Sequence, residues 1–205
     1  VPVYRCMAWL IAIALCSTCA FADAEMSWEP PQPPRNAALI YYRAFLMFNP
    51  LAPRTDKAAD EALRKLLEEG VYDDAALSPW LDSNRAAITL LVQGAAVDEC
   101  DFGVQFDQGP AALLPELARA RGVARLGVAA MAQALAQGDY ANALELFEAV
   151  LALARGVSCE ATVIGSLVAA TLVDAASGQA PALLAALCGR TALLERIRNT
   201  LDDAA

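Results

Sequence analysis

Apolar residues recur with a helical period along most of this chain. After Asn36, an almost uninterrupted apolar segment, 37–48, ends just before Pro50, which predicts a buried or interface helix capped by Asn36. A second apolar set, 59–67, recurs every three or four positions until Gly70. No segment alternates apolar and polar residues in the two-residue period of a strand. The pattern therefore predicts helices and no sheet.

The helical pattern continues to the end of the chain. Ser78-Pro79 and Ser158 have the residue types that begin helices. The later helices are expected at 78–97, 112–137, 140–155 and 158–177, followed by two short helices or by one helix kinked at Gly189. These expectations give an all-α fold of antiparallel helical hairpins, either tetratricopeptide-like or an irregular helical bundle, in a single domain spanning 36–205.

The first two dozen residues have the pattern of a secretory leader. Arg5 precedes an uncharged run, 6–22, that ends in the small-x-small triplet Ala20-Phe21-Ala22, so residues 1–24 are expected to be a signal peptide. The alternative is an uncleaved anchor through 6–22, which at about 17 residues is at the lower limit for a spanning helix. Residues 25–35 are rich in proline and predict an extended spacer. The protein is therefore expected to be exported, either periplasmic or secreted, with membrane anchoring as the alternative.

Composition narrows the chemistry. The net charge is −9, which disfavours nucleic acid as a partner because phosphate binding needs a concentrated basic surface. The chain contains no histidine, which excludes Ser-His-Asp and Cys-His nucleophile pairs and the usual imidazole zinc sites. No cofactor and no metal are expected. Any enzymatic activity would have to depend on carboxylates or other residue types.

The one sizeable polar and aromatic loop is expected at 98–110. Its acids Asp98, Glu99, Asp101 and Asp107 lack the spacing of a calcium-binding loop, so a solvated acidic loop is the simpler interpretation. A carboxylate-dependent hydrolase using the segment 98–107 is the alternative, because a pair of carboxylates can supply a general acid and a general base.

Aromatic residues are expected to anchor this loop or to form an interaction surface. Tyr41 and Tyr42 are neighbours on the first helix and point to different faces, so one can pack in the core while the other lines a groove. Phe102 and Phe106 flank Gly103 and are expected to insert into the helical core, with an exposed ligand platform as the alternative.

Two arginines on the long helix are candidate partners of the loop acids. Arg121 and Arg125 are four residues apart and share a helix face. They are expected to bind the carboxylate of Asp101 or Asp107, or alternatively to line an anion-binding groove.

Three cysteines follow the leader: Cys100, Cys159 and Cys188. In an oxidising compartment Cys100 and Cys159 are a candidate disulfide, and three reduced thiols are the alternative.

The segment 138–147 resembles the turn and second helix of a tetratricopeptide repeat. Gly138 ends one helix, Asp139 caps the next at Tyr140, small Ala143 lets the two helices approach, and Phe147 fills the space behind it. The resemblance covers about residues 124–155, departs from the repeat pattern in its first helix, and has no second copy at a period of about 34 residues. It implies one helical hairpin.

More broadly, the chain resembles exported bacterial all-helical proteins of uncharacterised activity. The matching features are 36–42, 100–103, Gly109-Pro110 with 113–115, and the Gly138-Asp139 turn. This resemblance implies a fold and no activity. The sequence thus favours an exported, noncatalytic helical domain that binds a protein or peptide in the cell envelope. The hydrolase and a structural, membrane-anchored envelope component are its alternatives.

Overall fold

The described residues of this computed structural model are 35–52, 55–103, 115–159 and 162–202, and all of their regular structure is helical. The helices are α2 (Ala37–Met47), α3 (Lys57–Glu69), α4 (Asp74–Ser83), α5 (Arg85–Ala95), α6 (Pro115–Gln137), α7 (Tyr140–Ser158), α8 (Val163–Ser177), α9 (Ala180–Ala186) and α10 (Thr191–Asp202). They belong to one compact unit, Pro34–Ala205. The expected all-α fold is confirmed.

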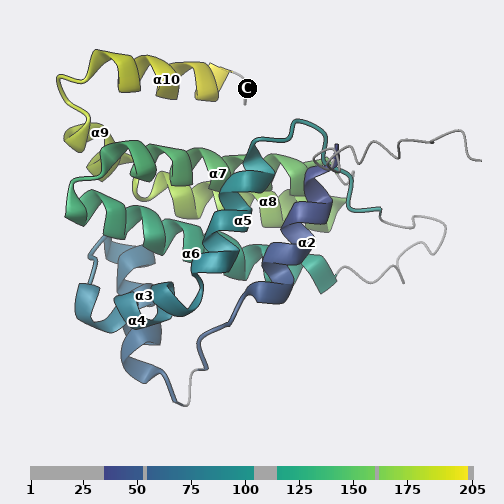
Figure 1. The fold of residues 1–205 in the computed structure, drawn as a ribbon, viewed down its shortest axis with the longest axis horizontal. Coiled ribbons are helices and arrows are strands. Elements are labelled where there is room, and N and C mark those ends of the chain that lie inside the picture. Colours follow the sequence, from purple (N-terminus) through teal and green to yellow (C-terminus); the bar gives the residue numbers. More distant parts are fainter. Residues whose placement is uncertain (1–34, 53–54, 104–114, 160–161, 203–205) are drawn as a thin grey trace, which may run out of the picture. The chain divides into compact units, whose positions relative to one another are not determined.

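Helix α7 is the centre of the packing. Figure 1 shows α6, α7 and α8 running side by side, with α2 and α5 crossing in front of them, and these helices contact one another. Along α7, buried side chains occur on most faces, including Leu144, Val150 and Leu153. A helix that is apolar on nearly every side must be enclosed by neighbours. The Ala- and Leu-rich composition therefore gives a core in which helices approach closely around α7.

The hairpin between α6 and α7 forms where the sequence predicts it. Gly138 has φ 76°, a left-handed conformation that glycine adopts without steric cost. The Asp139 carboxylate accepts the N–H of Asn142 at 3.2 Å and so caps α7. Ala143 and Phe147 are both buried. Asn36 likewise caps α2 by accepting the N–H of Ala38 at 3.0 Å.

The predicted single helix at 78–97 is wrong in two respects. It begins earlier, because the Asp73 carboxylate accepts the N–H of Ala76 and starts α4 at Asp74, which leaves Pro79 inside the helix. It is also divided in two at Asn84. The buried Asn84 side chain accepts the N–H of Asn49 at 2.7 Å and donates to the carbonyl of Trp80 at 2.9 Å, so it binds a distant segment at the junction of α4 and α5.

The predicted N-cap at Ser158 is also wrong. α7 continues through this residue, whose hydroxyl donates to the carbonyl of Arg155 at 2.7 Å. Thr162 caps α8 instead, by accepting the N–H of Gly165 at 2.9 Å. The end of α7 therefore lies about one turn later than expected. Arg155 and Gly156 belong to its last turn, and Cys159 is its C-cap residue.

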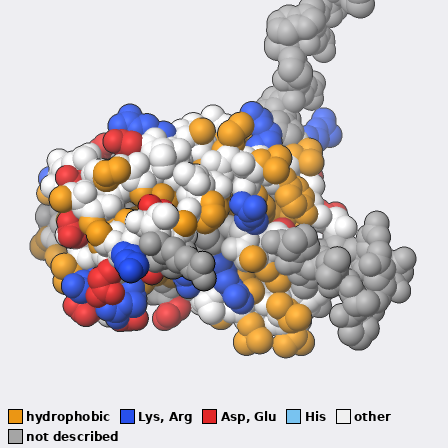
Figure 2. Space-filling view, turned by 90° about the horizontal axis from the view of Figure 1, so that it is seen from below, with side chains coloured by type: hydrophobic (Ala, Val, Ile, Leu, Met, Phe, Trp, Pro, Cys, Tyr) orange, Lys and Arg blue, Asp and Glu red, His pale blue; other side chains and the backbone are white. Residues whose placement is uncertain are grey.

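Several large apolar side chains remain on the surface. Leu46 on α2 is 84 % exposed, and Val163 and Leu167 on α8 are also exposed. In Figure 2 hydrophobic side chains gather toward the right, the end at which Figure 1 shows α2. Within the described residues, the stretch Val163–Ala186 is long and apolar enough to cross a membrane, but its most apolar part is 33 % buried. Core helices and leader segments meet the same criterion, so it assigns no membrane span.

Candidate functional site

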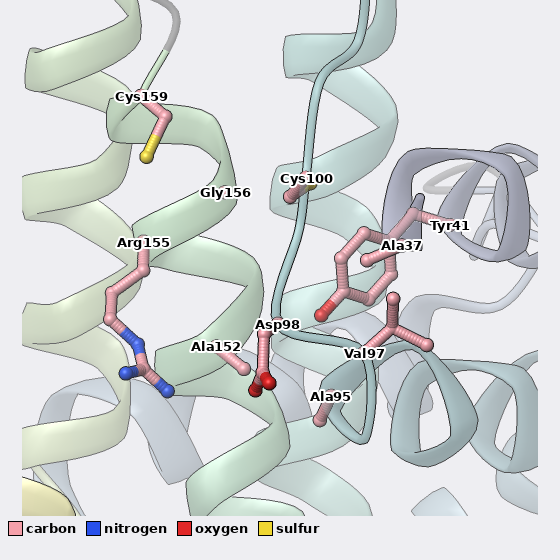
Figure 3. Close-up of a pocket in the computed structure, with 10 residues that line it drawn as sticks. All are labelled: Ala37, Tyr41, Ala95, Val97, Asp98, Cys100, Ala152, Arg155, Gly156 and Cys159. Carbon is pink, nitrogen blue, oxygen red and sulfur yellow. The ribbon is translucent and has the colours of Figure 1, made fainter. Parts of the chain in front are cut away.

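A pocket of about 260 Å³ lies between the beginning of α2, the segment that follows α5, and the end of α7 (Figure 3). Its lining consists of Ala37, Tyr41, Ala95, Val97, Asp98, Cys100, Ala152, Arg155, Gly156 and Cys159. Most of the walls are small and apolar, whereas a phenol, a carboxylate, a guanidinium and two thiols supply the polar chemistry. Because these residues come from three parts of the chain, only the fold brings them together.

One wall of the pocket is fixed to the beginning of α2 by hydrogen bonds. Asn36 makes two of them with Asp101, since its amide donates to the Asp101 carbonyl at 2.7 Å and its carbonyl oxygen accepts the Asp101 N–H at 3.0 Å. The Ala37 N–H donates to the carbonyl of Glu99 at 2.7 Å. The same asparagine that caps α2 therefore also holds the segment that carries Asp98 and Cys100.

An aromatic cluster lies behind this wall. Phe102 is buried and stacks on Tyr41 and Phe45, with ring centroids 6.2 Å apart in each case. Tyr42 meets the Phe102 ring edge-on at 5.5 Å, and its hydroxyl donates to the Phe102 carbonyl at 3.0 Å. Such pairs add to the stabilisation that burial gives, so the segment is anchored by its side chain as well as by its backbone.

Two glycines bring the pocket residues into close contact. A Cβ on Gly94 would overlap the Tyr41 ring, and a Cβ on Gly156 would lie 2.6 Å from the Cys100 sulfur. The ring of Tyr41 and the thiol of Cys100 thus rest directly on helix backbone, where a larger residue would displace them.

The Tyr41 hydroxyl is a polar group that the buried core presents to the pocket. The residue is only 1 % exposed, yet its oxygen points into the pocket (Figure 3), and no described residue forms a hydrogen bond with it. Burial raises the pKa of Tyr41 above its ordinary value; the nearby Cys100 raises this pKa further and Arg155 lowers it. At neutral pH this group is therefore an uncharged donor that faces whatever occupies the pocket.

Opposite charges stand at the mouth of the pocket. Figure 3 shows the Asp98 carboxylate and the Arg155 guanidinium on two sides of Ala152. Both side chains belong to exposed residues, and no ion pair joins either of them to another described residue. The pocket therefore offers a positive group, a negative group and a neutral donor at once.

The remaining loop residues have structural roles or lie outside the described residues. The Asp101 carboxylate accepts the N–H of Gly103 at 2.8 Å, which makes a local turn. Phe106 and Asp107 are outside the described residues. Within the described part of the chain, no group of three or more acidic or cysteine side chains could hold a metal ion.

The expected contact between Asp101 and the arginines of α6 is not formed. Arg121 and Arg125 are exposed, and among the described residues neither makes an ion pair. The Asp101 carboxylate instead accepts the N–H of Gly103, two residues along its own chain, a local side-chain-to-backbone bond that competes with longer-range partners.

The hairpin residues do not contribute to the pocket lining. Tyr140 is half-buried, and the guanidinium of Arg190 lies 3.9 Å above its ring in a cation–π contact that joins α7 to the turn before α10. Arg196 on α10 forms an ion pair with Glu148 of α7. The hairpin therefore supports the packing of the C-terminal helices.

Cys100 and Cys159 line the same pocket, and the structure contains no disulfide between any two of Cys100, Cys159 and Cys188. The pairing of Cys100 with Cys159 in an oxidising compartment stays a prediction.

Sequence reasoning missed Arg155, Ala152 and Gly156 as pocket residues. Arg155 is the one charged residue in the segment 149–157, and an isolated charge in an apolar helix was the available signal. Nothing in the sequence alone indicates that Gly156 faces Cys100.

Comparisons with protein-family models, curated proteins and solved structures found no match to this chain.

Proposed function

We propose that this chain is a noncatalytic helical domain that binds a peptide in the pocket between α2 and α7, and that it acts outside the cytoplasm. The observation that carries this proposal is the Tyr41 hydroxyl, which belongs to a buried residue, opens on the pocket and forms no hydrogen bond with a described residue. A buried polar group is normally paired, so an open one at a pocket is suited to a ligand or to water that a ligand displaces.

Binding is favoured over hydrolysis by the inventory of the pocket. An acid–base mechanism with two carboxylates needs a pair of acids facing each other across the substrate. Among the described residues that line the pocket, Asp98 is the only acid, and the chain has no histidine to replace the second one. Recognition of a charged and polar ligand needs no more than the groups that are present.

The test is capture of peptides from a random pool of short synthetic peptides on the immobilised full chain. We expect enrichment by the wild type and reduced enrichment by Arg155→Gln and Tyr41→Phe. Arg119→Gln is the matched control, because Arg119 is exposed on α6 and does not line the pocket. Equal enrichment by all four proteins, or none by any of them, would contradict the proposal.

A further inference from the structure

We infer that the pocket takes a small zwitterion, that is, a ligand with both a free ammonium group and a free carboxylate, such as an α-amino acid or a dipeptide. This inference rests on the proposed function and specifies the chemical class of the ligand. It follows from three features of the pocket: its pair of opposite charges, its neutral donor, and its size.

The opposite charges at the mouth require opposite charges on the ligand. Asp98 and Arg155 line the same pocket and form no ion pair with each other. A purely anionic ligand would pair with Arg155 but would be repelled by Asp98, and a purely cationic ligand would have the reverse problem. A zwitterion placed between them satisfies both, because its carboxylate can form a two-bond contact with the guanidinium while its ammonium donates to Asp98.

The Tyr41 hydroxyl determines which end of the ligand enters more deeply. Its raised pKa keeps it protonated at physiological pH, so it can donate a hydrogen bond to a carboxylate oxygen. The two donors, Tyr41 and Arg155, therefore favour the carboxylate, and Asp98 is left for the ammonium group. Figure 3 shows the three side chains around one opening, with the Tyr41 oxygen inside the pocket.

Size and lining restrict the remainder of the ligand. A volume of about 260 Å³ is at or below the lower limit for sites that hold drug-sized molecules, and it fits a ligand of one or two residues. The walls beside the polar groups are Ala37, Ala95, Val97 and Ala152, which favour a short aliphatic side chain. Nucleotides and other polyanions are disfavoured by the single arginine and by the net charge of −9.

A larger hollow elsewhere lacks this chemistry. It measures about 500 Å³ and lies beside Trp80 and Asp56. There the Asp56 carboxylate already accepts the N–H of Ala52 at 2.9 Å, and the Trp80 indole donates to the carbonyl of Asn49 at 2.9 Å. These polar groups are thus engaged within the protein, whereas Tyr41, Asp98 and Arg155 of the α2–α7 pocket form no side-chain hydrogen bond or ion pair with another described residue.

The test is isothermal titration calorimetry on the full chain with defined probes. The probes are each of the twenty standard L-amino acids, the dipeptide Ala-Ala, and the N-acetyl and C-amide forms of every probe that binds. We expect at least one free probe to bind, and either blocking group to weaken its binding at least tenfold. The probe that binds more tightly, a single amino acid or the dipeptide, shows which of these two kinds of zwitterion the pocket holds.

Variants assign each charge to its partner. In Asp98→Asn, N-acetylation of the probe is expected to weaken binding no further, because the carboxylate that binds the ammonium group is gone. In Arg155→Gln, amidation is likewise expected to have no effect, because the guanidinium that binds the ligand carboxylate is gone. Asp174→Asn and Arg119→Gln, which alter exposed residues outside the pocket, should bind as the wild type does.

The outcomes separate this inference from the proposed function. Two results would contradict the zwitterion inference while leaving peptide binding in place, provided that peptides are captured. One is equal binding of the free and blocked probes. The other is that Asp98→Asn and Arg155→Gln keep the wild-type preference for free probes. If no probe binds and no peptide is captured, both proposals are overturned.

Discussion

Tyr41 and Tyr42 are neighbours in sequence but place their rings and hydroxyl groups in different environments. The sequence predicts that one packs in the core while the other lines a groove. In the structure Tyr41 does both, because its ring is buried against Gly94 and Phe102 while its hydroxyl opens on the pocket. Tyr42 is 37 % exposed, and its hydroxyl anchors the Phe102 carbonyl. The role of each tyrosine thus depends on what its hydroxyl faces: the Tyr42 hydroxyl binds a backbone carbonyl, and the Tyr41 hydroxyl faces the pocket.

Replacing Tyr41 by Phe should be nearly neutral for stability at pH 7, within about 0.5 kcal/mol, because no described residue loses a hydrogen bond. In alkali the variant should be the more stable protein. The folded-state pKa of Tyr41 is raised by burial, so its contribution is complete below the unfolded pKa of about 10 and is lost as the pH rises toward the folded value. Urea unfolding at pH 7, 9 and 11 measures this. A variant that loses stability between pH 9 and 11 as steeply as the wild type would contradict it.

Asn84 is the buried polar residue on which the α4–α5 junction depends. Asn84→Ala leaves the N–H of Asn49 and the carbonyl of Trp80 without its side chain, and an unsatisfied buried group costs about 1–3 kcal/mol. We expect a loss of this size in urea unfolding. Asn142→Ala, at an exposed position on α7, is the control and should change stability by less than about 0.5 kcal/mol. Similar losses in the two variants would show that the junction is not held in this way.

At the level of the elements, local signals were predictable and tertiary ones were not. The caps at Asn36 and Asp139 depend on residues one turn away, so the sequence predicts them correctly. Ser78-Pro79 has the same local signature, but Asp73 caps earlier and Asn84 divides the helix through a bond to Asn49, far away in the chain. A local sequence pattern does not show which of two possible caps is used, or where a distant residue will divide a helix.

The same limit explains what the sequence predicts of the site. Tyr41, Cys100 and Cys159 are candidates from residue type alone, and Asp98 belongs to the predicted acidic loop. Arg155 joins them only because the end of α7 packs beside the segment after α5. The membership of a pocket formed by three distant segments is set by helix packing, which one sequence does not reveal.

The approach of α6 to α7 gives a test at this scale. A Cβ on Gly127 of α6 would lie 2.7 Å from Val150 on α7 and 2.8 Å from Leu91 on α5. Gly127→Ala should therefore destabilise the protein by about 1–3 kcal/mol through overpacking, although alanine is the better helix former. Gly178→Ala is the matched variant, because its nearest contact would be an ordinary 3.6 Å and its backbone is already helical.

We expect Gly178→Ala to stabilise the protein by about 0.4–1 kcal/mol by restricting the unfolded chain. Thermal and urea unfolding of the two variants should thus change in opposite directions. A stabilising Gly127→Ala would mean that α5, α6 and α7 do not approach as closely as the structure has them.

For the whole molecule, the predicted leader at residues 1–24 would determine the compartment in which the pocket works. The uncharged run 6–22 is short for a spanning helix and ends in two overlapping small-x-small triplets, 20–22 and 22–24, so cleavage after Ala22 or Ala24 is expected. Intact mass and N-terminal sequencing of the protein from a bacterial expression host should then give a chain that begins at Asp23 or Glu25, recovered in the soluble envelope fraction. Replacing Ala20, Ala22 and Ala24 by Leu should block processing and leave the chain in the membrane, because the small residues that the peptidase reads are gone. A wild-type chain that keeps residues 6–22 and sediments with membranes would instead make it an anchored protein, with α2 only a proline-rich spacer away from the bilayer.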